Sequence, residues 1–322
     1  MDRVAGRMAP FNKQGMFFTL IALTIVSILM VVASRSATVV QRSDSSALRI
    51  QAMDNFLSDV ENSYLPLAAR ASAYKAIASS TLYMNATGQF LSDPGSDLGG
   101  VMLNGTLGSA SIMANNTLQN FSARIEEFAS DIYGINLQMA VHSGSMAQTS
   151  PWRMDVAVNV SYVARADVGN WTREKRIATS IPVEGFLDPQ YLVRTGGAYQ
   201  HRIAQAGIPA TRWNISNLDA FVSSGNYTRF EGSDAPSFLE RFKASPAASE
   251  CCGIESTINP ASVSPGNQQE SYADYQFWAS SVECANLYDI SGGFSHSFFK
   301  LDFSHAFKYN VSAYATALSC TP

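Results

Sequence analysis

An uncharged run of 18 residues near the N-terminus constrains this chain more than any other feature. Residues 16–33 read MFFTLIALTIVSILMVVA and contain no Asp, Glu, Lys or Arg. At a rise of 1.5 Å per residue, a helix of this length spans roughly 27 Å, which is close to the thickness of a membrane's hydrocarbon core. The run therefore predicts a single transmembrane helix over residues 16–33.

The charges that flank the run predict its orientation. Three basic residues, Arg3, Arg7 and Lys13, precede it. Asp2 is the single acidic residue on that side. Basic residues mark the cytoplasmic side of a membrane helix, so we expect residues 1–15 to form a cytoplasmic leader. The rest of the chain is then extracellular, on a single-pass protein of the cell membrane. A cleaved secretory signal is the alternative, but its apolar part usually has only 7–15 residues.

Asparagine sequons give independent evidence for this topology. The pattern N-x-[ST] is the acceptor for N-glycosylation, and it requires an accessible asparagine outside the cytoplasm. Nine such sites follow the apolar run and none precedes it, whereas composition alone predicts roughly three. We therefore expect a glycoprotein, with candidate sites at Asn85, Asn104, Asn115, Asn120, Asn159, Asn170, Asn214, Asn226 and Asn310.

The cysteines agree with an extracytoplasmic body. There are four, an even number, all in the last quarter of the chain: Cys251, Cys252, Cys284 and Cys320. In this setting they predict two disulfides, and the count leaves three connectivities open. A bond between adjacent cysteines needs a strained ring, so we favour separate bonds from Cys251 and Cys252 to the other two. No C-x-x-C or neighbouring histidine pair suggests a metal site.

Composition and motifs argue against several functional classes. The formal charge of -4 and the pI near 5.6 argue against nucleic acid as a partner. The pattern S-x-x-K, found in some serine acylases, occurs at Ser72–Lys75 and Ser297–Lys300 without the other elements of those enzymes. We assign no catalytic residue, no cofactor and no metal ligand, and we expect that the chain is not an enzyme.

A long helix is expected to follow the membrane segment, within residues 34–83. Apolar residues recur there at alternating steps of three and four, which is a 3.5-residue stripe over residues 50–78. The stripe needs a partner, which is either another protein chain or this chain's own body. Pro66 removes a backbone donor, so we expect a kink near Asn62. The stripe comprises Ile50, Met53, Leu57, Val60, Tyr64, Leu67, Ala71, Tyr74 and Ala78.

Residues 84–190 are expected to form an α+β domain. The Gly- and Asn-rich stretch 84–111 is typical of a loop, and 112–133 predicts a helix that ends at Gly134. Apolar residues then alternate with polar ones over 135–141, 156–162 and 177–183, and Asp167–Asn170 is a hairpin signal. This pattern predicts an antiparallel meander of three strands packed on a helix.

Residues 191–322 have a weaker pattern and carry all the cysteines. Short helices are expected at 217–224 and 236–243, loop over 244–271, and additional strands within 295–317. We expect this part to be a disulfide-bearing subdomain.

Two stretches carry a family resemblance. Residues 13–20, KQGMFFTL, resemble the start of archaeal type IV pilin-like proteins with class III signal peptides. That resemblance implies cleavage after Gly15 and a mature N-terminus at Met16. Gln14 and Leu20 depart from the charged residue and the Glu of that family.

The chain also resembles uncharacterised archaeal membrane-anchored surface proteins. The resemblance rests on the segments MDNFLSDVE at 53–61, IPVEGFLDPQY at 181–191, APSFLERF at 235–242 and CGIES at 252–256. It implies a cell-surface setting and assigns no activity.

These observations favour a non-enzymatic membrane-anchored surface protein, either a pilin-like subunit or a plain anchor. Its partners would be the lipid bilayer and, through the 50–78 stripe, copies of itself or other surface proteins. An anchored extracytoplasmic ligand-binding module or hydrolase is the alternative.

Overall fold

The computed structural model describes residues 45–208, 213–229, 235–259, 270–280, 282–291 and 299–319. Contacts divide the chain into two units, Met1–Met53 and Asp54–Pro322. The expected leader and transmembrane segment lie outside the described residues. Within the described ranges, no helix combines the length and the hydropathy that a membrane crossing requires.

Three consecutive helical segments open the described chain: α2 (Ser45–Asp59), the π-helical turn η1 (Val60–Tyr64) and α3 (Leu65–Thr87). The turn η1 ends two residues before Pro66, near the expected kink. The backbone N–H of Leu65 donates to the carbonyl of Val60, one residue further back than in an α-helix. Proline has no N–H for the helix ladder, so the wider turn accommodates it.

The π-helical turn changes which face of the helix is buried. Leu57 and Val60 are buried, as the stripe predicts, but Leu67 and Tyr74 are 47% and 49% exposed. The body of the chain therefore covers the second half of the stripe only in part, and a partner chain at this stripe stays a prediction. One extra residue in a turn rotates everything after it, so the buried face of α3 consists of Leu65, Ala68, Ala69, Ser72, Ala73, Ala76, Ile77, Ser80, Thr81 and Met84.

The stretch predicted as a loop contains a helix, α4 (Pro94–Asn104), and a small hairpin of β1 (Thr106–Leu107) and β2 (Ala110–Ser111). Its glycines allow close packing. A Cβ atom on Gly99 would lie 2.3 Å from the carbonyl oxygen of Gly144 in the neighbouring strand. The glycine content therefore reflects contact between a helix and a strand, which a single sequence does not distinguish from a loop.

The expected second helix is α5 (Leu118–Tyr133), which starts six residues later than predicted. Thr117 and Asn120 form a reciprocal capping box at its start, which satisfies backbone donors that a helix end leaves free. Gly134 ends the helix with φ at +62°, as predicted.

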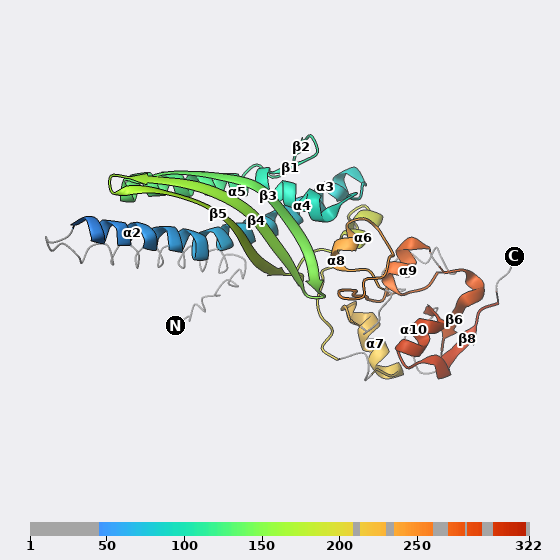
Figure 1. Cartoon of the computed structure of the whole chain (residues 1–322). Helices are drawn as coiled ribbons and strands as arrows, with labels where there is room; N and C mark the ends of the chain where they lie inside the picture. Colours follow the sequence, from blue (N-terminus) through green and yellow to red (C-terminus); the bar gives the residue numbers. More distant parts are fainter. Residues whose placement is uncertain are drawn as a thin grey trace, which may run out of the picture. The chain divides into compact units, whose positions relative to one another are not determined.

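The antiparallel meander is confirmed. It consists of β3 (Asn136–Ser150), β4 (Arg153–Ala166) and β5 (Gly169–Pro182) in the order β3-β4-β5, and Figure 1 shows the three long strands side by side. Ala166 pairs with Gly169, so the hairpin turn lies where the sequence predicts it. Alternate side chains of β4 are buried, and helices α3, α4 and α5 contact the sheet. The buried set on β4 is Met154, Val156, Val158, Val160, Tyr162 and Ala164.

The C-terminal part has short elements joined by long connections (Figure 1). Both expected helices are present, as α7 (Ile215–Ser224) and α8 (Phe238–Arg241). The tail contributes a helix and two strands, β7 and β8, which both pair antiparallel with the preceding strand β6 in the order β7-β6-β8. The other elements are α6 (Pro189–Arg194), α9 (Asp274–Ala279), η3 (Cys284–Asn286), β6 (Leu287–Ile290), β7 (Lys300–Asp302), α10 (Phe303–Lys308), η4 (Ser312–Tyr314) and β8 (Ala315–Ala317).

Candidate functional site

The sequon asparagines are spread over both parts of the described body. Asn85 and Asn226 are half-buried, and the other seven are exposed: Asn104, Asn115, Asn120, Asn159, Asn170, Asn214 and Asn310. Asn159 lies on the central strand β4, where its amide donates to Ser143, and Asn170 lies at the start of β5. Their amides can therefore be reached from solvent on a strand, at a hairpin and at helix ends.

The disulfide pairing differs from our expectation. Cys251 and Cys252 bond to one another, with an S–S distance of 2.02 Å, so the prediction that they reach separately to Cys284 and Cys320 is wrong. The turn around Ser249–Gly253 directs both sulfur atoms to the same side, which permits the bond between neighbours. Cys284 is also disulfide-bonded, and Cys320 lies outside the described residues.

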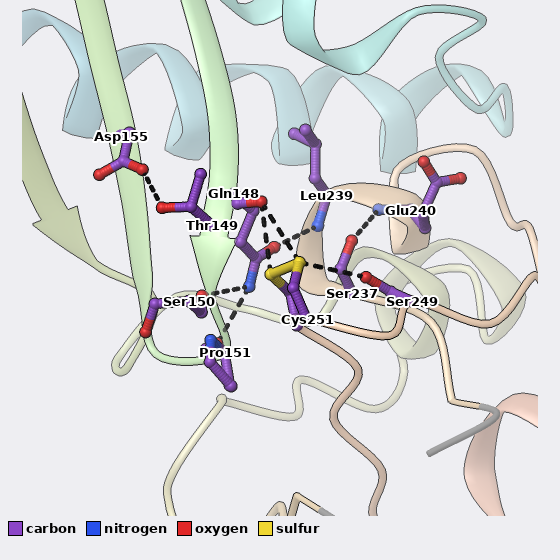
Figure 2. The surroundings of a disulfide bond; sticks show 11 residues. Gln148, Thr149, Ser150, Pro151, Asp155, Ser237, Leu239, Glu240, Ser249 and Cys251 are labelled. Atoms are coloured by element: carbon purple, nitrogen blue, oxygen red, sulfur yellow. Dashed lines mark hydrogen bonds between the residues drawn. A yellow bond between two sulfur atoms is a disulfide. The ribbon is translucent and has the colours of Figure 1, made fainter. Parts of the chain in front are cut away.

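The adjacent cysteines lie where the C-terminal part meets the end of β3. Figure 2 shows both sulfur atoms directed at the backbone of Gln148, whose carbonyl oxygen lies 3.7 Å from Cys251 Sγ and 3.3 Å from Cys252 Sγ. The side chain of Gln148 accepts a hydrogen bond from the backbone N–H of Leu239 at 3.1 Å. One residue of the meander therefore contacts two segments of the C-terminal part.

A charged network is buried in the C-terminal part around Arg241, the last residue of α8. Its Nη1 atom donates to Oδ2 of Asp188 and to Oδ2 of Asp274, both at 2.7 Å, and all three side chains are fully buried. Its Nη2 atom donates to the carbonyl of Ile254 at 2.6 Å. The ring of Tyr227 lies 5.1 Å from the guanidinium, and its hydroxyl donates to Asp188.

The network joins elements that are far apart in sequence. Asp188 caps α6 through the backbone N–H of Gln190, and Asp274 begins α9. Burial opposes the charge on Arg241, but the two carboxylates raise its pKa well above the usual value. The paired charges therefore connect α6, α8 and α9 in the interior of the C-terminal part, out of reach of solvent.

A second buried network surrounds His305 in α10. Its Nδ1 atom lies 2.5 Å from Asp302 Oδ2, and its Nε2 atom lies 3.5 Å from Glu255 Oε2. The hydroxyl of Tyr275 lies 3.3 Å from Nε2, and the hydroxyl of Tyr309 donates to Glu255 at 3.0 Å. Burial acts to lower the pKa of His305, but the carboxylates of Glu255 and Asp302 raise it to about 10. The imidazole is therefore charged at neutral pH.

A third cluster joins the π-helical turn to the meander. Glu61 accepts hydrogen bonds from the hydroxyl of Tyr162 and, at 3.1 Å, from Arg173 Nη1, and it lies 3.3 Å from Lys175 Nζ. Burial acts to raise the pKa of Glu61, but these three partners lower it overall. The turn therefore places a carboxylate against cations on β5.

The S-x-x-K serine that the structure describes is engaged in packing. Ser72 is fully buried and donates to the carbonyl of Asn116 at 2.8 Å, whereas Lys75 is exposed. Lys75 lines an open groove of about 650 Å³ with Ser79 and Tyr83 of α3 and with residues 111–116, which include Asn115. The lining combines one cation, hydroxyl groups and amides with the apolar side chains of Leu82, Ile112 and Met113, so it does not favour one kind of ligand.

No group of three or more His, Cys, Asp or Glu side chains suited to a metal ion occurs among the described residues. Of the four histidines, His296 lies outside the described ranges. His142 is hydrogen-bonded to Ser161, and His201 to the carbonyl of Gly225.

Reasoning from the sequence missed the buried charges. Four of them lie in segments that the sequence analysis quotes: Glu61 in 53–61, Asp188 in 181–191, Arg241 in 235–242 and Glu255 in 252–256. Nothing in these segments marks the buried charges, because Asp54 and Asp59 in the first of them belong to the same residue class as Glu61.

The chain was also compared with known proteins. No family model, no curated protein and no solved structure matches it.

Proposed function

We propose that this chain is a non-enzymatic surface protein, held in the cell membrane by a single helix over residues 16–33, with its described body outside the cell. The observation that carries the proposal is the exposure of seven sequon asparagines in a chain that also has an 18-residue uncharged run. The disulfide between Cys251 and Cys252 supports it, because such bonds persist in oxidising compartments.

Within this proposal, a pilin-like subunit is the more specific form. It is supported by the succession of α2, η1 and α3 and by the meander that packs on α3. A helix that leaves the bilayer to pack against copies of itself must lose its cationic leader, since Arg3, Arg7 and Lys13 would otherwise be buried without partners. A plain anchor keeps those cations at the cytoplasmic face.

The topology is tested by mapping glycopeptides of the protein purified from its own membranes. We expect added mass at the exposed sequon asparagines and none at Asn136, which is equally exposed but lies outside any sequon. Thr172→Ala should abolish the addition at Asn170 alone. Unmodified sequons, together with full protection from protease added to intact cells, would contradict the proposal.

The pilin-like form is tested by sequencing the mature N-terminus. A start at Met16 supports it. If residues 1–15 remain attached, the pilin-like form fails and the plain anchor stands.

A further inference from the structure

The bond between Cys251 and Cys252 does not act as an ordinary cross-link. A disulfide stabilises a fold mainly by closing a loop in the unfolded chain, and this effect grows with the number of residues enclosed. No residue lies between these two cysteines. Chain entropy therefore gives this bond almost no stabilising effect, and its presence needs another explanation.

The two sulfur atoms differ in their access to solvent. Cys251 is exposed, whereas Cys252 is fully buried. Thiol–disulfide exchange needs an attacking thiolate to approach one sulfur in line with the bond, and exposed disulfides are the ones that exchange. The exposed atom, Cys251 Sγ, is therefore the point of attack, and Cys252 is the leaving group.

The surroundings fit the reduced pair as well as the bonded one. A disulfide sulfur carries no proton, so in the bonded form the carbonyl oxygen of Gln148 only contacts the two sulfurs, at 3.7 and 3.3 Å. A thiol carries a proton and can donate it to a carbonyl. The same oxygen is therefore an acceptor for the reduced form (Figure 2).

Backbone contacts that involve no sulfur atom also hold this turn. The carbonyl of Ser249 accepts hydrogen bonds from the backbone N–H groups of Cys252 at 3.3 Å and Gly253 at 3.0 Å. The backbone N–H of Ser249 donates to the carbonyl of Ala235. A Cβ atom on Gly253 would lie 2.4 Å from the carbonyl oxygen of Ala235, so the backbone is closely packed there. None of these contacts uses a sulfur atom, so we expect them to persist when the bond opens.

We propose that Cys251–Cys252 is a reversible exchange site for dithiols. A thiolate of the dithiol attacks Cys251 Sγ, the bond between the cysteines breaks, and its electron pair leaves on Cys252 Sγ, which takes up a proton. The second thiol of the dithiol then attacks the mixed disulfide, which releases Cys251 as a thiol and leaves the dithiol oxidised to its disulfide. Two electrons and two protons reach the protein. This inference goes beyond the proposed function, and its test uses purified protein, so it does not depend on cellular location.

The experiment treats the oxidised, purified full chain with increasing dithiothreitol under native conditions, followed by alkylation and peptide mass mapping. We expect Cys251 to be alkylated at least about tenfold faster than Cys284, while the far-ultraviolet circular dichroism stays unchanged. Equal or earlier opening at Cys284, or resistance of the adjacent pair until the chain unfolds, would overturn the proposal.

Two single variants test the direction of attack. Cys252→Ser leaves an exposed thiol at Cys251, and Cys251→Ser leaves a buried one at Cys252. We expect maleimide to label the first at least about tenfold faster. Equal rates would contradict attack at Cys251. The double variant Cys251→Ser/Cys252→Ser should lose the early phase of alkylation and keep the melting temperature of the parent, whereas a large fall would show that the bond is structural.

Discussion

The meander and the C-terminal part bury different kinds of side chain. Within residues 54–183, Glu61 is the one charged residue counted among the buried described side chains. Among the described residues of 184–319, six acidic or basic side chains are buried: Asp188, Arg241, Glu255, Asp274, Lys300 and His305. The meander has strands of 14 or 15 residues, whereas the strands of the C-terminal part have three or four.

This difference shows two ways of fixing a chain in place. Long strands fix one another through many ladder bonds, and a period of two then selects the buried face. Short elements with long connections have few such bonds. In the C-terminal part, we infer that buried ion pairs fix which segments meet, because an incorrect arrangement would leave a charge unpaired in the core.

Arg241→Met gives the largest expected effect. It leaves Asp188 and Asp274 buried without their cation, and breaking a buried pair in this way typically costs about 3–5 kcal/mol. Urea unfolding should show this loss, and hydrogen exchange should place it in the C-terminal part. The control is Lys243→Ala, which removes an exposed ion pair to Glu240 and should cost less than about 1 kcal/mol. If both variants lost the same free energy of unfolding, the buried charges would not be what stabilises the C-terminal part.

Alkaline pH should weaken the C-terminal part next. The pKa of His305 is about 10 in the folded chain, against an ordinary value of 6.5. A raised pKa gives stability that is complete below pH 6.5 and is lost as the pH rises towards 10. Between pH 6.5 and 8.5 the free energy of unfolding should fall by about 2–3 kcal/mol. It is measured by urea unfolding, as the midpoint concentration multiplied by the dependence of the free energy on urea.

His305→Gln is the matched variant for this test, because it removes the titrating group and keeps a side chain that forms hydrogen bonds. It should be less stable than the parent at pH 6.5 and should show a much flatter dependence on pH. The groups that face His305 are Asp302, Glu255, Tyr275 and Tyr309. An unchanged slope would assign the pH dependence to another group.

The smallest loss of stability is expected where α4 packs against the meander, because close packing rather than buried charge determines stability there. Gly99→Ala places a Cβ atom 2.3 Å from the carbonyl oxygen of Gly144, so α4 must move away from β3, and such overpacking costs about 1–3 kcal/mol. Its neighbour Gly100 is the control, because its nearest such atom lies 3.9 Å away. Gly100→Ala should be neutral or stabilise α4 by up to about 1 kcal/mol in urea unfolding. Equal effects would mean that the helix and strand can separate freely.

The sequence predicted the parts of the fold that depend on local periodicity. Residues 156–162 and 177–183 alternate because one face of each strand is buried, and the turn between them carries its own signal. Helix α4 was missed because the meaning of Gly99 depends on Gly144, 45 positions along the chain. A single sequence does not show which of its glycines lie against another backbone.

The candidate sites divide in the same way. The sequons could be found because three consecutive residues define each of them. Disulfide bonding could be predicted because the number of cysteines is even. The pairing of Cys251 with Cys252 could not, since it depends on the turn that Ser249 and Gly253 form. Arg241 was missed because its partners lie 53 positions before it and 33 positions after it in the chain.

The π-helical turn Val60–Tyr64 adds one residue to a helical turn and so rotates the helix that follows it. Before it, the helix presents Leu57 and Val60 to the protein interior; after it, the row that continues the same heptad places Leu67 and Tyr74 where about half of each side chain is exposed. One helix thereby serves its own fold and leaves a second, separate strip of apolar surface on its outer side.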